Sequence, residues 1–223
     1  MGQTITLTAS DGFKLGGYRA EPATKAKAAI VVIQEIFGVN SHIRNVCDRF
    51  AKEGYVAVAP AIFDRIEPDF QSGYSPDEVA TARKFVASPD WAAMLRDTQA
   101  AIDAVKDAGP VGIVGFCLGG SVAYAAATKL NRLSAAVGYY GGAIARFADD
   151  KPSVPTLLHF GEKDTGIPMT DVEAIKAKRP DMEIHIYSGA QHGFGCDERA
   201  SYDKTSADLA WQRSLAFFAK HLK

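Results

Sequence analysis

A single cysteine, Cys117, lies between an apolar run and a run of small residues, in the segment Gly115-Phe116-Cys117-Leu118-Gly119-Gly120. The flanking runs predict a buried strand over 111–114 and a helix over 121–127, so the cysteine is expected at a sharp strand-to-helix turn. Such a turn needs glycine two residues before and two after the nucleophile, because a Cβ there would collide with neighbouring backbone. The helix N-terminus would also favour ionisation of the thiol. The segment therefore predicts a nucleophile elbow, and its alternative is a glycine-rich turn around a buried structural cysteine.

Two residues downstream complete the order nucleophile, acid, histidine. Asp164 follows the apolar run 155–160, and His192 follows the run 184–187. Both runs are typical of buried strands, and the carboxyl ends of parallel strands meet at one edge of a sheet. Taken singly, Asp164 suits a solvated turn and His192 an ordinary loop. Together with Cys117, in the order typical of this elbow, they predict a catalytic triad.

The elements that would position these residues alternate between strands and helices. This alternation predicts an α/β fold with a mainly parallel sheet, helices on both faces and an N-terminal antiparallel hairpin around Asp11-Gly12. Ser41 is expected to cap the first helix, and the segment between Pro60 and Pro76 is expected to be irregular and to border the site. The expected strands are 3–8, 13–20, 28–34 and 55–59, and the expected helices are 41–53, 76–87, 90–108 and 202–221.

The chain resembles the dienelactone hydrolase family, within the α/β-hydrolase superfamily, over nearly its whole length. Three segments carry the resemblance, and a fourth, 137–141, does so more weakly. A cysteine elbow combined with Gln-Glu-Ile-Phe-Gly is specific, because most of the superfamily has a serine nucleophile and a His-Gly element in the first loop. The three segments are Gln34-Glu35-Ile36-Phe37-Gly38-Val39-Asn40, Gly115-Phe116-Cys117-Leu118-Gly119-Gly120 and Gln191-His192-Gly193-Phe194.

The resemblance implies a carboxymethylenebutenolidase-like enzyme that hydrolyses a carboxylic ester or lactone through a thioester on Cys117. It implies His192 as base and acid, Asp164 as the residue that orients it, and Glu35 as a further catalytic residue beside the thiol. The implied oxyanion hole consists of the backbone N–H groups of Ile36 and Leu118. Without the resemblance, Glu35 is better interpreted as a residue that caps a turn or pairs with a surface cation such as Arg44.

The sequence departs from the family pattern at one position that concerns substrate recognition. In family members that open dienelactone, arginines hold the substrate carboxylate. One of these arginines lies a few residues after the catalytic histidine in the sequence. Cys196 stands at that position here, which leaves Arg199 as the nearest substitute and Arg83 or Arg65 as the second cation. Small esters and lactones other than dienelactone therefore fit equally well. The candidate substrate-binding residues are Arg83, Arg199, Tyr139 and Phe37.

Two alternatives to this activity stay open at the level of sequence. One is a thioesterase or another small-ester hydrolase of the same fold. The other is a non-hydrolytic protein that uses Cys117 as a thiol sensor. A sensor would need neither a complete triad nor an oxyanion loop, so hydrolysis is favoured.

Composition narrows the class of protein further. The chain has 223 residues, 47% of them hydrophobic, and a formal net charge of −1, which fits a single α/β-hydrolase domain over 1–223. Its balanced charge argues against nucleic acid or membrane as the main partner. The three cysteines lack the spacing of a disulfide framework or a metal site, so no metal or cofactor is expected. The start of the chain lacks the pattern of a signal peptide, and we expect a cytoplasmic enzyme that is a monomer or weak homodimer.

Overall fold

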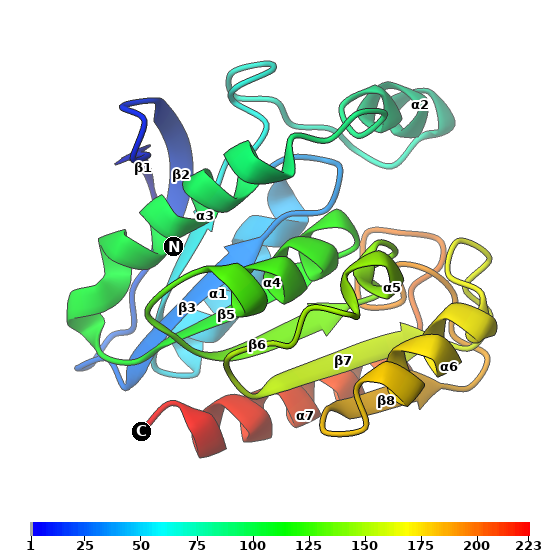
Figure 1. Ribbon diagram of the computed structural model, residues 1–223. Helices are drawn as coiled ribbons and strands as arrows, with labels where there is room; N and C mark the ends of the chain where they lie inside the picture. Colours follow the sequence, from blue (N-terminus) through cyan, green and yellow to red (C-terminus); the bar gives the residue numbers. More distant parts are fainter. Residues whose placement is uncertain (1) are drawn as a thin grey trace.

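An eight-stranded sheet runs through the computed structural model, which describes residues 2–223 (Figure 1). Its strand order is β1-β2-β4-β3-β5-β6-β7-β8. The pairs β1–β2 and β2–β4 are antiparallel, and the remaining neighbours are parallel. The strands are β1 (Gln3–Thr8), β2 (Lys14–Ala20), β3 (Ala28–Ile33), β4 (Tyr55–Pro60), β5 (Val111–Phe116), β6 (Leu133–Tyr139), β7 (Thr156–Gly161) and β8 (Glu183–Tyr187).

Helices cover both faces of the sheet (Figure 1). One face carries α1 (Ser41–Lys52) and α7 (Lys204–His221), and the other carries α3 (Trp91–Val105) and α4 (Leu118–Lys129). α5 (Ile144–Phe147) contacts both α4 and α6 (Met169–Lys178), whereas α2 (Pro76–Lys84) stands apart from the sheet. None of the helices within residues 2–223 combines the length and apolar character needed to cross a bilayer.

The central strands are apolar along their whole length because helices cover both of their faces. All six residues of β3 are buried, and successive side chains enter different cores. Ile30 lies in the core that also contains Phe50 of α1, whereas Val31 lies in the core that contains Ile102 of α3. The predicted fold class is therefore confirmed, together with the hairpin whose turn contains Gly12 at φ 83°.

The ends of several elements differ from the sequence prediction. The N-cap of α1 is Asn40, whose side chain accepts a hydrogen bond from the Ile43 N–H, and not Ser41. The Ser41 hydroxyl instead donates to Glu198, on the loop after β8. α2 ends at Lys84 and α7 begins at Lys204, so both helices are shorter than predicted.

The order of the strands brings several loops together at one edge of the sheet. β4 and β5 flank β3 on opposite sides, so the carboxyl ends of β3 and β5 border the point where the strand order reverses. In open α/β sheets, ligands bind at such a switch point. The loop after β8, orange in Figure 1, lies on the side toward which β6 and β7 point. This edge carries the predicted site residues.

Candidate active site

Cys117 occupies a strained turn between β5 and α4. Its φ of 55° and ψ of −116° lie outside the conformations that residues other than glycine normally adopt. A Cβ at Gly115 would overlap the carbonyl oxygen of Gly119, and one at Gly119 would overlap the carbonyl oxygen of Ile33. The two glycines therefore allow β5, α4 and β3 to approach closely enough for the turn to form.

The three triad residues form a continuous hydrogen-bonded row. His192 Nε2 lies 3.1 Å from Cys117 Sγ, and His192 Nδ1 lies 2.7 Å from Asp164 Oδ2. The Asp164 side chain is buried, and its second oxygen accepts a hydrogen bond from the Gly166 N–H at 2.8 Å. Because the ionised carboxylate can only accept, it holds a proton on Nδ1 and directs Nε2 toward the sulfur.

The surroundings of His192 favour its protonated form. Burial by itself lowers the pKa of the ring, but negative charge on Cys117 and the hydrogen bond to Asp164 outweigh burial and raise the pKa to about 10. An imidazolium at neutral pH places a proton donor beside the sulfur. The same nitrogen can then serve as acid toward a leaving group and, after losing its proton, as base toward water.

Glu35 is paired with Arg199 beside this row. The side chain of Glu35 is 1% exposed, and its Oε1 accepts a hydrogen bond from Arg199 Nη1 at 3.0 Å. Burial opposes the charge on Arg199, but the carboxylate outweighs it and raises the pKa of the guanidinium. The pairing with Arg44 considered from the sequence does not occur, since Arg44 donates to Gln71 instead.

A second group of residues, which sequence reasoning did not assign to the site, adjoins Glu35. The Cys196 thiol donates to the Tyr74 hydroxyl oxygen at 3.3 Å, and Asn40 Nδ2 donates to the same oxygen at 3.0 Å. His42, from the first turn of α1, is buried with them. The sequence of the Gln34–Asn40 segment indicated where the strand ends. It did not indicate that His42 and Tyr74 would lie beside Glu35 and Cys196.

The triad opens into a cavity of about 480 Å³. Cys117, His192 and Ile36 line it, and Leu118 is the first residue of α4, where backbone N–H groups have no acceptor within the helix. Besides His192, three basic side chains line the cavity, and none of its described lining residues is acidic. The remaining lining residues are Phe37, Val79, Arg83, Val86, Lys163, Thr165, Gly166, Gln191, Arg199 and Ser201.

Three of the four candidate substrate-binding residues lie at the triad cavity, and the fourth does not. Phe37, Arg83 and Arg199 line the triad cavity. The placement of Tyr139 in the substrate pocket is wrong: its ring is buried toward α7, where its hydroxyl lies 2.8 Å from Ser214 Oγ. Arg65 is also engaged elsewhere, in an ion pair with Asp97.

Comparison with known proteins identifies the family of this chain. The sequence profile of the dienelactone hydrolase family matches residues 15–222. A Synechocystis sp. relative, provisionally named a carboxymethylenebutenolidase, is 39% identical, with 99% of this chain and 97% of the relative covered. The carboxymethylenebutenolidase of Pseudomonas putida is 32% identical, with 96% and 95% covered. A crystal structure from Klebsiella pneumoniae, provisionally described as a dienelactone hydrolase, is 32% identical and superposes with a TM-score of 0.84 over 99% of both chains. The chain therefore belongs to the dienelactone hydrolase family.

Proposed function

We propose that this protein hydrolyses small carboxylic esters or lactones, with Cys117 as nucleophile, His192 as acid and base, and Asp164 orienting the imidazole. The observation that carries the proposal is the hydrogen-bonded row from Asp164 Oδ2 through His192 to Cys117 Sγ, at the mouth of a cavity. Membership of the family supports the same reaction class.

In the first half-reaction, the Cys117 sulfur attacks the ester carbonyl carbon and the carbonyl electrons move onto oxygen. The backbone N–H groups of Ile36 and Leu118 would donate to this oxyanion, each contributing about 3 kcal/mol of transition-state stabilisation. Collapse of the intermediate breaks the carbon–oxygen bond, and His192 Nε2 gives its proton to the leaving alkoxide. The product is a thioester on Cys117 and a hydroxyl group, which stays on the same molecule if the substrate is a lactone.

In the second half-reaction, water attacks the thioester carbonyl while His192 Nε2 accepts a proton from it. The second tetrahedral intermediate expels the Cys117 thiolate and releases the carboxylic acid. Sulfur and imidazole then regain their starting state, so the cycle consumes one water and needs no other reactant.

The charges around the cavity support an anionic substrate. Arg83 and Lys163 line it, and the charge of Arg199, which lines it as well, is balanced by the buried Glu35. A substrate that carries a carboxylate in addition to its ester would be attracted to these cations. We therefore favour carboxylate-bearing esters or lactones over neutral ones of the same size.

The triad is tested by Cys117→Ala, His192→Ala and Asp164→Asn, assayed on one small aryl ester. The first two should each lower turnover by about 1,000-fold, and the three effects should not add, because the residues act as a unit. Quenched wild-type reactions should contain an acyl adduct that peptide mass mapping locates on Cys117. Turnover near the wild-type value in purified, folded Cys117→Ala would overturn the proposal.

The substrate class is tested by Arg83→Gln, with a neutral ester and its carboxylate-bearing analogue as substrates. Arg83 is exposed on α2, so its loss should leave the fold intact and lower kcat/KM about fivefold for the charged ester only. Lys84→Gln is the matched control, since Lys84 is an exposed neighbour outside the cavity. Equal losses on both esters would contradict recognition of the carboxylate.

A further inference from the structure

Three potential metal ligands, two from the segment 35–42 and one from the loop after β8, meet in the interior of the protein. Glu35, His42 and Cys196 each place one ligand atom within 4.8 Å of the others. Their exposures are 1%, 2% and 0%, so the cluster is closed to bulk water. These residues come from the loop after β3, the start of α1 and the loop after β8.

Two of the ligand atoms have no hydrogen-bond partner in the described part of the chain. They are Glu35 Oε2 and His42 Nε2, both fully buried. Most buried polar atoms in proteins are paired, because an unsatisfied one costs about 1–3 kcal/mol. An oxygen and a nitrogen left free in the same buried cluster point to a group that both would bind.

Neighbouring residues orient the cluster as they do around bound metals. His42 Nδ1 lies 3.5 Å from Asp197 Oδ1, which leaves Nε2 directed away from that carboxylate. A histidine that binds a metal through one nitrogen commonly donates the other N–H to a carboxylate. Cys196 Sγ lies 3.3 Å from the Tyr74 hydroxyl, which can rotate its proton toward a thiolate.

We propose that Glu35, His42 and Cys196 form a binding site for a divalent transition-metal ion of the zinc type. Carboxylate oxygen, imidazole nitrogen and thiolate sulfur together are a donor set that zinc accepts, with a fourth position left for water. Binding would release the Cys196 proton to solvent, so that the thiolate offsets one charge of the ion. Glu35 would share its negative charge between the ion and Arg199. No electron is transferred, and the reaction needs only the ion.

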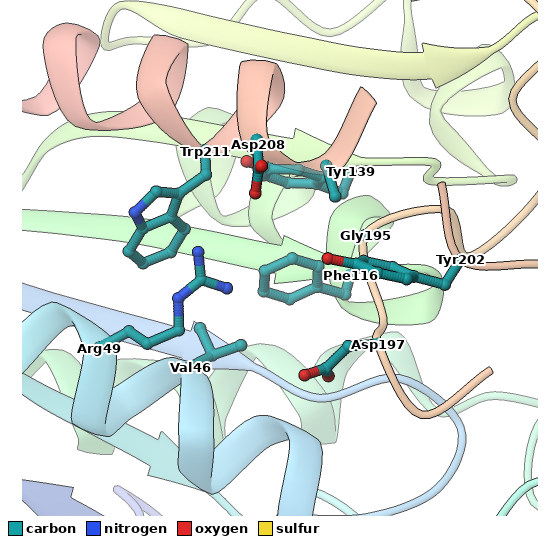
Figure 2. Close-up of a pocket in the computed structure, with 10 residues that line it drawn as sticks. Val46, Arg49, Phe116, Tyr139, Gly195, Asp197, Tyr202, Asp208 and Trp211 are labelled. Carbon is teal, nitrogen blue, oxygen red and sulfur yellow. The ribbon is translucent and has the colours of Figure 1, made fainter. Parts of the chain in front are cut away.

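We expect an ion to enter through a neighbouring cavity. It has a volume of about 220 Å³, and Gly195 and Asp197, the two neighbours of Cys196, line it. Figure 2 shows Asp197 at its wall near Phe116, with Arg49 and Trp211 farther along. Because Asp197 also approaches His42, an ion that enters here would meet the outer residue of the proposed site first.

The test uses Zn²⁺ alone with the Cys117→Ser protein, so that the catalytic thiol cannot contribute a ligand. Titration against a chelator should show one tightly bound ion per chain. His42→Gln and Cys196→Ser should each weaken binding by about 100-fold or more, and Asp197→Asn by about tenfold. Co²⁺ in place of Zn²⁺ should give a sulfur-to-metal charge-transfer band that Cys196→Ser removes.

Cys47→Ala and His185→Gln serve as matched controls and should leave the affinity unchanged, since neither residue belongs to the cluster. Asp197 is 63% exposed, so Asp197→Asn remains informative if a buried variant fails to fold. Absence of tight binding, or binding that survives both His42→Gln and Cys196→Ser, would overturn the site. Ester turnover is not a readout here, so this result is independent of the proposed triad.

Discussion

At the scale of single residues, the three cysteines differ in what surrounds their sulfur atoms. Burial raises the pKa of Cys47 above the range of ordinary thiols and raises that of Cys196 to about 12. Cys117 is partly exposed and faces His192 at 3.1 Å. Reactivity is therefore expected to follow position and not residue type.

Iodoacetamide should accordingly label Cys117 well before Cys47 or Cys196, and hydrolysis should be lost in step with that labelling. Mass mapping of peptides over time measures the three rates in one experiment. His192→Ala should slow labelling of Cys117 by at least about tenfold, because it removes the cation beside the sulfur. Equal labelling of Cys117 and Cys47 would contradict this assignment.

The Glu35–Arg199 pair offers a second residue-scale prediction. Arg199→Met leaves the carboxylate of Glu35 buried without its cation, and should lower the free energy of unfolding by about 3–5 kcal/mol. Adding Glu35→Gln removes the stranded charge and should restore part of the loss. Denaturant titration of the wild type, both single variants and the double variant gives the coupling between the two residues. If the changes in unfolding free energy of the two single variants simply added in the double variant, Glu35 and Arg199 would contribute to stability independently, which would contradict the prediction.

At the scale of elements, an ion pair ties the irregular segment after β4 to α3. Arg65 Nε and Nη2 donate to Asp97 at 2.9 and 2.8 Å, and the Asp97 side chain is fully buried. Burial raises the pKa of Asp97, although Arg65 opposes this effect. This irregular segment is thus held by a buried carboxylate and not by backbone pairing alone.

We expect Arg65→Met to destabilise the protein by about 3 kcal/mol, since it leaves Asp97 buried and unpaired. Arg96→Met is the control, because Arg96 pairs with Asp11 at an exposed position and should change stability by at most about 1 kcal/mol. Chemical unfolding measures both values. A loss in Arg65→Met no larger than in Arg96→Met would contradict a structural role for the buried pair.

The sequence predicted the existence of these elements better than their ends. Continuous apolar runs identified the central strands, because strands covered on both faces have no polar side. The cap of α1 was misassigned between Asn40 and Ser41, which are both good cap residues. The Ser41 hydroxyl donates instead to Glu198, which is 157 positions away, and a local sequence pattern cannot predict such a distant contact.

At the scale of the whole molecule, the parts of the site that follow from local sequence patterns were predictable, and the parts that depend on contacts between distant loops were not. Cys117, Asp164 and His192 could be brought together because each follows a recognisable strand, and parallel strands share an edge. The contacts of Glu35 with Arg199, and its proximity to His42 and Cys196, depend on how loops fold back over that edge. Tyr139 was misplaced because an aromatic residue at a strand end suits either face equally well.

A buried chain of hydrogen bonds joins three strands to the last helix. His159 Nδ1 lies 2.8 Å from the Tyr187 hydroxyl, and His159 Nε2 lies 3.0 Å from Ser214 Oγ on α7. Ser214 Oγ also lies 2.8 Å from the Tyr139 hydroxyl and donates to the Ala210 carbonyl. These partners let His159 remain neutral, with its proton on Nε2.

Stability should therefore fall on acidification. Burial lowers the pKa of His159 well below its ordinary value of 6.5, so below pH 6.5 the unfolded chain binds a proton that the folded protein does not. The free energy of unfolding should then decrease by up to about 1.4 kcal/mol per pH unit. His159→Gln should have a shallower slope than the wild type between pH 6.5 and 4.5. Parallel slopes in the two proteins would contradict this assignment.

Cys117, Asp164 and His192 lie on turns and loops that follow strands, and the loops that precede strands supply no residue of the triad. The segment 21–27, which leads into β3, is mostly exposed and lies at the amino end of that strand. The two edges of the sheet are therefore under different constraints. The loops at the carboxyl ends of the strands must keep their geometry, whereas those at the amino ends only have to connect one element to the next. New termini, inserted peptides or fused domains placed at residues 23–25 should be tolerated without loss of turnover. Substitutions that alter which ester is accepted can accumulate on the opposite edge while the sheet and its two cores stay unchanged.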